Sequence, residues 1–381
     1  MGNSIDKNGK YLYLPGLDGI RAFAASLVIF VHFNQFAYLF GLSGFYHQVE
    51  TAGIAVTVFF VLSGFLITYL LLEEKLKFGS VSLLKFYMRR ILRIWPLYYL
   101  ILIITFILYI AIPYLHQGND LKRIFNLYAF FLPNYAYVIN LTLVPITPLW
   151  SIGVEEQFYL IWPWLFKGIK SAEQLLVFLL VFLAAFLLIK VIVRFYGNEA
   201  WYTFLTVTRL DCMALGGLAG YLLKQKHTFF LKIIYHPLSQ YITLGVFLVT
   251  ILYKPFHMAS IFDGDVYGVL ALVLIVNVCS NPASLVKLEA GVLKFIGRIS
   301  YGLYCYHMLI ILVLSLLLRG VVLPNTKLAQ VGMFLLVYLT TVGVAYLSYN
   351  FIELKFINLK ERFSMIFSRN SDKLSLQNDP Q

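Results

Sequence analysis

The run EQLLVFLLVFLAAFLLIKVIV, residues 173–193, decides the class of fold, because its 21 residues include only two charged ones, Glu173 and Lys190. A helix of about 20 mostly apolar residues crosses the hydrocarbon core of a bilayer. The whole chain of 381 residues has this character, with 60% hydrophobic and 13% charged residues, where soluble domains contain about half and a quarter. The composition argues against a soluble enzyme, a nucleic-acid-binding domain and a disordered protein. It predicts an all-α, polytopic membrane protein.

Ten apolar runs follow one another along the chain. We place them near residues 18–40, 53–72, 94–115, 149–166, 173–193, 206–223, 239–253, 265–281, 299–318 and 329–352. The stretch 121–148 is also apolar, but Pro133, Pro145 and Pro148 interrupt it, and prolines at this density break helices. We therefore predict about ten transmembrane helices, with 116–148 as an external or re-entrant element.

Basic residues predict the orientation. With ten spans and a cytoplasmic N-terminus, the inside segments hold 21 Lys and Arg residues and the outside segments hold six, as the positive-inside rule requires. If 121–148 crossed the bilayer, three later basic loops would lie outside. We therefore expect both termini to be cytoplasmic, with a membrane domain over residues 1–356 and a polar, partly disordered tail over 357–381.

Ionisable residues inside the predicted spans carry the functional argument, because such groups are costly in a bilayer. The three cysteines lie in apolar runs and predict no disulfide framework. The sequence contains no metal-ligand spacing, no Gly-rich phosphate loop and no serine hydrolase elbow. We therefore predict neither a metal nor a bound cofactor.

Arg21 and His32 lie eleven residues apart in the first predicted span. At about 100° per residue this spacing returns to nearly the same helix face, about 16 Å along the axis. Imidazole is the side chain best suited to take and return a proton near neutral pH. We interpret His32 as a candidate proton carrier, with a structural core histidine as the alternative.

Arg89, Arg90 and Arg93 precede the third predicted span in the stretch FYMRRILRIWPLYYL. Arg90 and Arg93 share a face if the helix starts early, and paired guanidinium groups match the geometry of phosphate. The alternatives are ordinary positive-inside anchoring and binding of anionic lipid.

Glu155 and Glu156 interrupt the aromatic stretch PLWSIGVEEQFYLIWPWLF. On a helix, Glu155 shares a face with Tyr159 and Trp162. A carboxylate in such surroundings must be paired, hydrated or protonated, and it can orient a histidine. The alternative is a structural partner for an arginine inside the membrane.

Other polar residues of the spans have weaker assignments. Arg209 and Asp211 are two residues apart, so we expect them to pair with other helices rather than with each other. Tyr304 and His307 form part of a polar helix edge, for which a structural role is the alternative. Further candidates are Lys190, Ser63 and Gly64, of which the last two are first interpreted as packing residues.

Seven stretches in order resemble the acyltransferase 3 family of integral-membrane O-acyltransferases. They are LPGLDGIRAFAASLVIFVHF, FFVLSGFLIT, RRILRIWPLYY, PLWSIGVEEQFYLIWP, RLDCMALGGLAGYL, ISYGLYCYH and YNFIELKF. The resemblance covers residues 14–356. Since the sequence ends soon after the last predicted span, it resembles the type that stands alone, without an SGNH esterase-like domain.

The resemblance implies transfer of an acyl group, most often acetyl from acetyl-CoA, to a hydroxyl of a cell-envelope or exported carbohydrate. It implies that His32 is the catalytic histidine, as general base or acyl carrier, with Arg21 as its motif partner and Glu155 as the motif carboxylate. Arg90 and Arg93 match its Arg-x-x-Arg motif on the donor side, with Arg89 beside them. Arg209, Asp211, His307, Tyr304, Ser63 and Gly64 are expected to support this site.

The implied location is the bacterial plasma membrane. The implied partners are acyl-CoA as co-substrate, a carbohydrate acceptor, the lipid bilayer, and either further copies of the chain or a separate extracytoplasmic transferase; nucleic acid is not among them. The alternative function is a transporter or flippase of a lipid-linked glycan, which would share the span count and the buried charges.

Overall fold

The structure, a computed structural model, describes residues 11–12, 14–46, 50–112, 115, 118, 120–253, 260–363 and 367–368. Most of the predicted tail 357–381 lies outside these residues. The helices are α1 (Leu17–Gln35), η1 (Ala37–Phe40), α2 (Glu50–Phe78), α3 (Leu83–Ala111), α4 (Leu121–Ala129), α5 (Pro133–Val138), η3 (Val144–Leu149), α6 (Trp150–Gly168), α7 (Ala172–Tyr196), α8 (Glu199–Thr208), α9 (Leu210–Lys224), α10 (Thr228–Tyr235), α11 (Pro237–Leu252), α12 (Ser260–Ser280), α13 (Gly291–Arg298), α14 (Ser300–Leu317), α15 (Lys327–Ser348), η4 (Tyr349–Glu353), α16 (Leu354–Lys360) and η5 (Glu361–Phe363). Two short strands, β1 (Tyr11–Leu12) and β2 (Phe367–Ser368), pair in parallel.

Each of the ten predicted runs coincides with a helix, namely α1, α2, α3, α6, α7, α9, α11, α12, α14 or α15. Among the described residues, seven helices are long and apolar enough to cross a membrane, or eight if α10 and α11, bent by 54°, count as one span. Of the ten, α6 carries Glu155, Glu156 and Lys167, and α9 is only 15 residues long. The count of ten crossings and the orientation of the termini stay predictions.

Helix α2 lies at the centre of the bundle, packed along α9. A Cβ atom on Gly64 would overlap the carbonyl of Met213, and one on Gly216 would overlap the carbonyl of Val61. Glycine at these positions lets the two backbones touch, as small residues do between membrane helices. The predicted packing role of Gly64 is confirmed, and Gly216 has the same role on α9.

Helix α3 begins at Leu83, eleven residues before the apolar run that starts near residue 94. Arg89, Arg90 and Arg93 therefore lie inside this helix, whereas we expected them just before the span. A long helix can keep arginines in its first turns because their flexible side chains reach polar surroundings. Because the helix starts early, Arg90 and Arg93 lie on the same face of α3. Their guanidinium groups can therefore act together on one ligand.

The stretch 116–148 contains three short helices, α4, α5 and η3. The longest of them has nine residues, which at about 1.5 Å per residue is too short to cross a bilayer. The segment packs against α3, because the hydroxyl of Tyr98 donates to the carbonyl of Tyr128 over 2.7 Å and the ring of Phe131 stacks on Tyr98. Among the described residues of this stretch, no helix is long enough to span, which agrees with the prediction; the side of the membrane on which the stretch lies stays a prediction.

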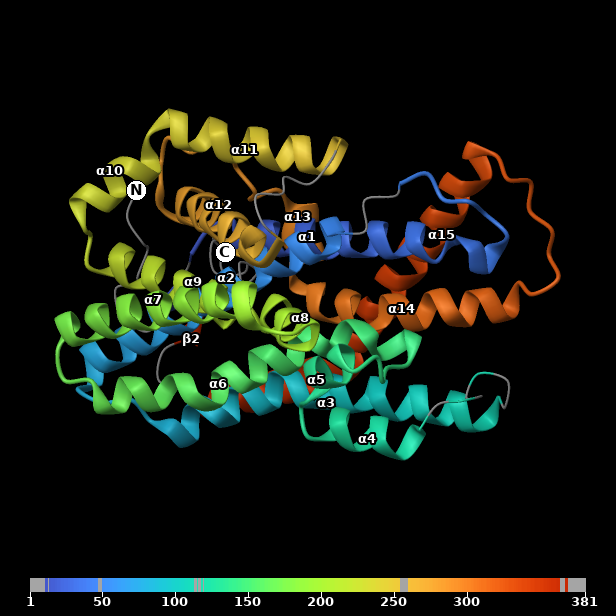
Figure 1. The fold of residues 1–381 in the computed structure, drawn as a ribbon, viewed down its shortest axis with the longest axis horizontal. Coiled ribbons are helices and arrows are strands. Elements are labelled where there is room, and N and C mark those ends of the chain that lie inside the picture. Colours follow the sequence, from blue (N-terminus) through green and yellow to red (C-terminus); the bar gives the residue numbers. More distant parts are fainter. Residues whose placement is uncertain are drawn as a thin grey trace, which may run out of the picture.

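Five helices surround the region described next. Helix α1 contacts α2 and α14, and α6 contacts α2 and α3. In Figure 1, α1 and α14 run side by side, while α3 and α6 lie below them. Helix α7 is peripheral: only 11% of the residues in its apolar stretch are buried within the protein, against 78% for α2.

Candidate active site

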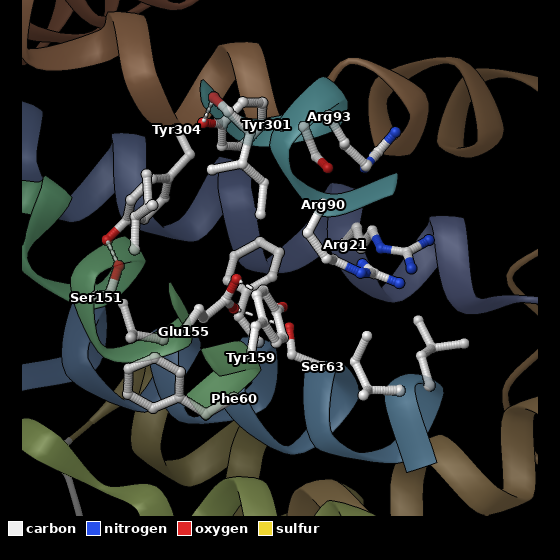
Figure 2. A pocket seen from close by; sticks show the side chains of 17 residues that line it. Arg21, Phe60, Ser63, Arg90, Arg93, Ser151, Glu155, Tyr159, Tyr301 and Tyr304 are labelled. Atoms are coloured by element: carbon white, nitrogen blue, oxygen red, sulfur yellow. Dashed lines mark hydrogen bonds between the residues drawn. The ribbon is translucent and has the colours of Figure 1, made fainter. Parts of the chain in front are cut away.

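A cavity of about 130 Å³ lies between α1, α2, α3, α6 and α14. Its lining combines apolar side chains with ionisable and hydroxyl-bearing ones. The polar lining residues are Arg21, Ser63, Arg90, Arg93, Ser151, Glu155, Tyr159, Ser300, Tyr301 and Tyr304. We call this cavity the arginine pocket; Figure 2 shows its lining.

Three guanidinium groups gather at one end of the arginine pocket, as Figure 2 shows. Arg21 leaves the first turns of α1 and binds Asp18 at 2.7 Å. Arg90 and Arg93 come from one face of α3. Arg90 lies over the ring of Tyr159, 5.3 Å from its centre, and its Nε is buried with no hydrogen-bond partner among the described residues. This end is therefore suited to an anion, since guanidinium groups recognise phosphate and carboxylate.

Glu155 occupies the middle of the pocket. The hydroxyl of Ser63 donates to its Oε1 over 2.8 Å, and the hydroxyl of Tyr159 donates to its Oε2 over 3.0 Å. The predicted shared face of Glu155 and Tyr159 is confirmed. Ser63 does more than pack, because it holds this carboxylate across two helices. Glu156 contacts a different partner, the indole N–H of Trp95, at 3.0 Å.

Arg89 does not line the arginine pocket. Its guanidinium forms an ion pair with Glu74 at 2.9 Å and donates to the carbonyl of Phe363 at 3.0 Å. Of the three arginines expected on the donor side, the structure brings Arg90 and Arg93 together with Arg21 and directs Arg89 elsewhere.

His32 lies in the last turn of α1, and the residue as a whole is intermediate between buried and exposed. Its Nδ1 is 3.0 Å from Nε2 of His307, and the two rings are 20° from parallel. His307, on α14, is fully buried. The ring of His32 thus shares its hydrogen bond with a second imidazole, whereas from the sequence Glu155 was a candidate partner.

Tyr304 connects the histidine pair with the arginine pocket. His32 is not among the residues that line the pocket, whereas the Tyr304 side chain is. The hydroxyl of Tyr304 lies 2.7 Å from the hydroxyl of Ser151 and 2.8 Å from the carbonyl of Pro148, at the opposite side of Figure 2 from Arg21. The carbonyl of Tyr304 contacts Nδ1 of His307 at 2.7 Å. One residue therefore forms the pocket wall and holds the histidine behind it.

The remaining buried charges lie in another part of the bundle. Lys190 on α7 forms ion pairs with Asp211 on α9 and with Asp265 on α12. Arg209 donates to the carbonyls of Gly53 and Thr206 at 2.8 and 2.7 Å. The expectation that Arg209 and Asp211 pair with other partners is confirmed. We call Lys190, Asp211 and Asp265 the lysine–aspartate cluster.

Sequence reasoning missed two carboxylates. Asp265 was not singled out, although its run SIFDGDVYGVLALVLIVNVCS contains two aspartates beside an apolar stretch. Glu353 is buried in the π-helical turn η4, and its Oε1 has no hydrogen-bond partner among the described residues. Its position in the stretch YNFIELKF was the available signal, since a carboxylate near the end of an apolar run is unusual.

The arrangement has two chemically different ends. The arginine end can hold an anionic group, and the histidine pair can take a proton. Arg21 and His32 are separated along α1 by about 16 Å, and Tyr304 forms part of the pocket wall. A ligand that uses both ends needs an anionic part and an extended arm.

Residues 14–350 match a family described as an acyltransferase domain. The chain is 30% identical over 368 residues to proteins named O-acetyltransferase OatA from Staphylococcus aureus strains NCTC 8325 / PS 47 and COL. In both cases the alignment covers 90% of this chain and 57% of the relative, so the chain spans little more than half the length of these proteins. No solved structure matches the chain.

Proposed function

The chain belongs to the family of this acyltransferase domain, and from that premise we propose that it transfers an acyl group from acyl-CoA to a hydroxyl of a carbohydrate. The observation that carries the proposal is the arginine pocket, where three guanidinium groups converge on a cavity whose opposite wall is backed by a pair of hydrogen-bonded histidines. The names of the relatives favour acetyl as the acyl group.

The arginine end is the proposed donor site. CoA carries several phosphates, and Arg21, Arg90 and Arg93 offer charge and hydrogen-bond donors to them. The cavity of about 130 Å³ is smaller than the ~300–1,000 Å³ of sites that enclose a drug-sized ligand. It therefore suits an acetyl group and the end of its carrier, while the bulk of the nucleotide stays outside. The flexible arm of CoA would lead the thioester toward Tyr304.

His32 is the proposed general base. It removes the proton of the acceptor hydroxyl, the hydroxyl oxygen bonds to the thioester carbonyl carbon, and the carbon–sulfur bond breaks. The proton then passes from His32 to the leaving thiolate, which restores the enzyme. The buried position of the site limits access of water, which would otherwise hydrolyse the thioester.

Glu155 is the proposed support of the donor site. It holds Tyr159 at 3.0 Å, and the ring of Tyr159 lies against Arg90. When ionised, Glu155 also offsets part of the positive charge of the three arginines. The proposal includes a bacterial plasma membrane location and, as possible partners in the wider reaction, a second copy of the chain or a separate extracytoplasmic transferase.

The test uses the purified chain in lipid nanodiscs with acetyl-CoA and a panel of cell-envelope glycans. Free CoA thiol and the acetyl mass increment on the glycan are both measured. We expect release of CoA only with an accepting glycan, loss of transfer in His32→Ala, and a higher KM for acetyl-CoA in Arg93→Gln.

Arg89→Gln is the matched control, because it removes a neighbouring guanidinium that does not line the pocket. Equal KM changes in Arg93→Gln and Arg89→Gln would contradict the donor site. Glycan movement across the bilayer without any acetylated product would show a flippase and overturn the proposal.

A further inference from the structure

We propose that His307 is a positioning residue that fixes the tautomer of His32, so that Nε2 of His32 is the nitrogen that takes the proton. The inference rests on the proposed function for its chemical meaning. Its structural content concerns only the hydrogen bonds that join His32, His307 and Tyr304.

The argument starts at Nδ1 of His307, which is 2.7 Å from the carbonyl oxygen of Tyr304. A carbonyl oxygen only accepts hydrogen bonds. Nδ1 of His307 must therefore carry a hydrogen, because two lone pairs at this distance would repel each other. The contact joins residues three apart on α14, a local side-chain-to-backbone bond of a kind known in helices.

The second step concerns Nε2 of His307. This side chain is fully buried, and its hydrogen-bond partners, the ring of His32 and the backbone of Tyr304 and Leu303, carry no negative charge. A cation at such a place would be buried without a counter-ion, which is costly. His307 is therefore the neutral imidazole with its hydrogen on Nδ1, and its Nε2 can only accept.

The third step passes this constraint to His32. Nδ1 of His32 lies 3.0 Å from Nε2 of His307, so Nδ1 of His32 is the donor and carries the hydrogen. In the neutral ring the lone pair is then on Nε2. Among the residues that the structure describes, the ring of His32 makes its hydrogen bond through Nδ1, and Nε2 has no partner. The basic nitrogen is thus free to take a proton.

This arrangement replaces a carboxylate by an imidazole. In a serine hydrolase, an aspartate holds the base in the correct tautomer by accepting its Nδ1 hydrogen. Here His307 accepts that hydrogen without bringing a charge into the bundle. When Nε2 of His32 receives the hydroxyl proton, the hydrogen on Nδ1 stays where it is, and no second proton moves.

The first test is spectroscopic and needs no activity. The full chain is labelled with ¹⁵N-histidine in nanodiscs, and the signals of His32 are assigned by their absence in His32→Gln. We expect the Nδ1–H pattern for His32 in the unmodified protein, and a shift to the Nε2–H pattern in His307→Leu, where the acceptor is gone. An Nε2–H pattern in the unmodified protein would overturn the inference.

The second test is kinetic, with rescue. We expect His307→Leu to lower kcat about 100-fold, within the range for loss of a correctly placed base, with the KM for acetyl-CoA unchanged. His307→Gln, whose amide oxygen can accept the Nδ1 hydrogen, should recover kcat to within about 10-fold of the original. Tyr306→Phe is the control on the same helix, because it removes a bond to Ser348 only, and we expect its kcat to be unchanged.

The outcomes separate the two proposals. If His307→Gln is folded but as inactive as His307→Leu, the positioning role is refuted even though acyl transfer stands. If the unmodified protein transfers no acyl group, the proposed function fails, while the ¹⁵N spectra still decide the tautomer.

Discussion

The arginine pocket and the lysine–aspartate cluster both bury ionisable side chains among apolar helices, but they differ in how the charges are balanced. In the lysine–aspartate cluster, one ammonium group lies between the carboxylates of Asp211 and Asp265. In the arginine pocket, Arg21 is paired with Asp18, but Arg90 and Arg93 form no ion pair among the described residues. They lie at one end of a cavity of about 130 Å³, whose lining carboxyl group, that of Glu155, is held by two hydroxyls. A buried charge by itself therefore does not identify a functional site. A buried charge without a counter-ion, next to a cavity, is a better indication of a functional site.

The sharpest test of this comparison removes the proposed base. We expect His32→Ala to lower the rate of acyl transfer by about 10³–10⁴-fold, since no other group takes the proton. Stability should fall by about 1–3 kcal/mol, because the variant leaves Nε2 of the buried His307 without its partner. Turnover of acetyl-CoA and thermal unfolding in the same nanodiscs measure the two effects. A residual rate above about one tenth would contradict the catalytic role.

The lysine–aspartate cluster should show the opposite pattern. Lys190→Ala leaves two carboxylates without their partner, and we expect a loss of about 3–5 kcal/mol in stability. The KM for acetyl-CoA should be unchanged in the protein that remains folded. Unfolding in denaturant, followed by kinetics, separates the two quantities.

The control for Lys190→Ala replaces all three charges together, as Lys190→Met with Asp211→Leu and Asp265→Leu. Apolar replacement of a complete buried ion cluster is often neutral or stabilising. We expect this triple variant to keep its activity. A stable but inactive triple variant would show that the cluster takes part in the reaction.

Arg90→Gln tests the arginine pocket. It removes a guanidinium from the arginine pocket, and a charged hydrogen bond is worth about 1.5–3 kcal/mol. We expect the KM for acetyl-CoA to rise about 10- to 100-fold and its dependence on salt to weaken. Measurement of KM at two salt concentrations tests both, and an unchanged KM would remove Arg90 from the donor site.

The smallest effect is expected for Ser63→Ala. The variant removes one of the two hydroxyl groups that donate to the Glu155 carboxylate. The loss costs about 1 kcal/mol, or about a fivefold change in kcat/KM. Ser315→Ala is the matched control, because that hydroxyl bonds only to the carbonyl of Leu312 in its own helix. Equal effects of the two variants would mean that the carboxylate needs no such support.

Much of the architecture was predictable from the sequence. Apolar runs located the ten helices because a helix of about 20 apolar residues is the simplest structure that satisfies its backbone in lipid. The start of α3 was not predictable in this way, because its first turns are polar and amphipathic rather than apolar. The stretch 116–148 was predicted to be non-spanning from its prolines and from the distribution of basic residues in the later loops.

The candidate site was predictable as a set of residues but not as an arrangement. The sequence singled out Arg21, His32 and Glu155 because ionisable groups are rare in apolar runs, and Arg90 because it forms a pair with Arg93 that matches phosphate geometry. The sequence could not distinguish these site residues from Lys190, which is also an ionisable residue in an apolar run. Nor could it show that Arg89 turns away from its neighbours toward Glu74.

The amino-acid sequence by itself determined the class of protein, the positions of the helices and the short list of buried ionisable groups. These follow from composition and from patterns along a single helix. The tertiary structure decided the partners: Ser63 meets Glu155 across 92 positions of the chain, and His32 meets His307 across 275. A hydrogen bond acts over about 3 Å, so its partner depends on how the helices pack, and no local pattern in the sequence carries that information.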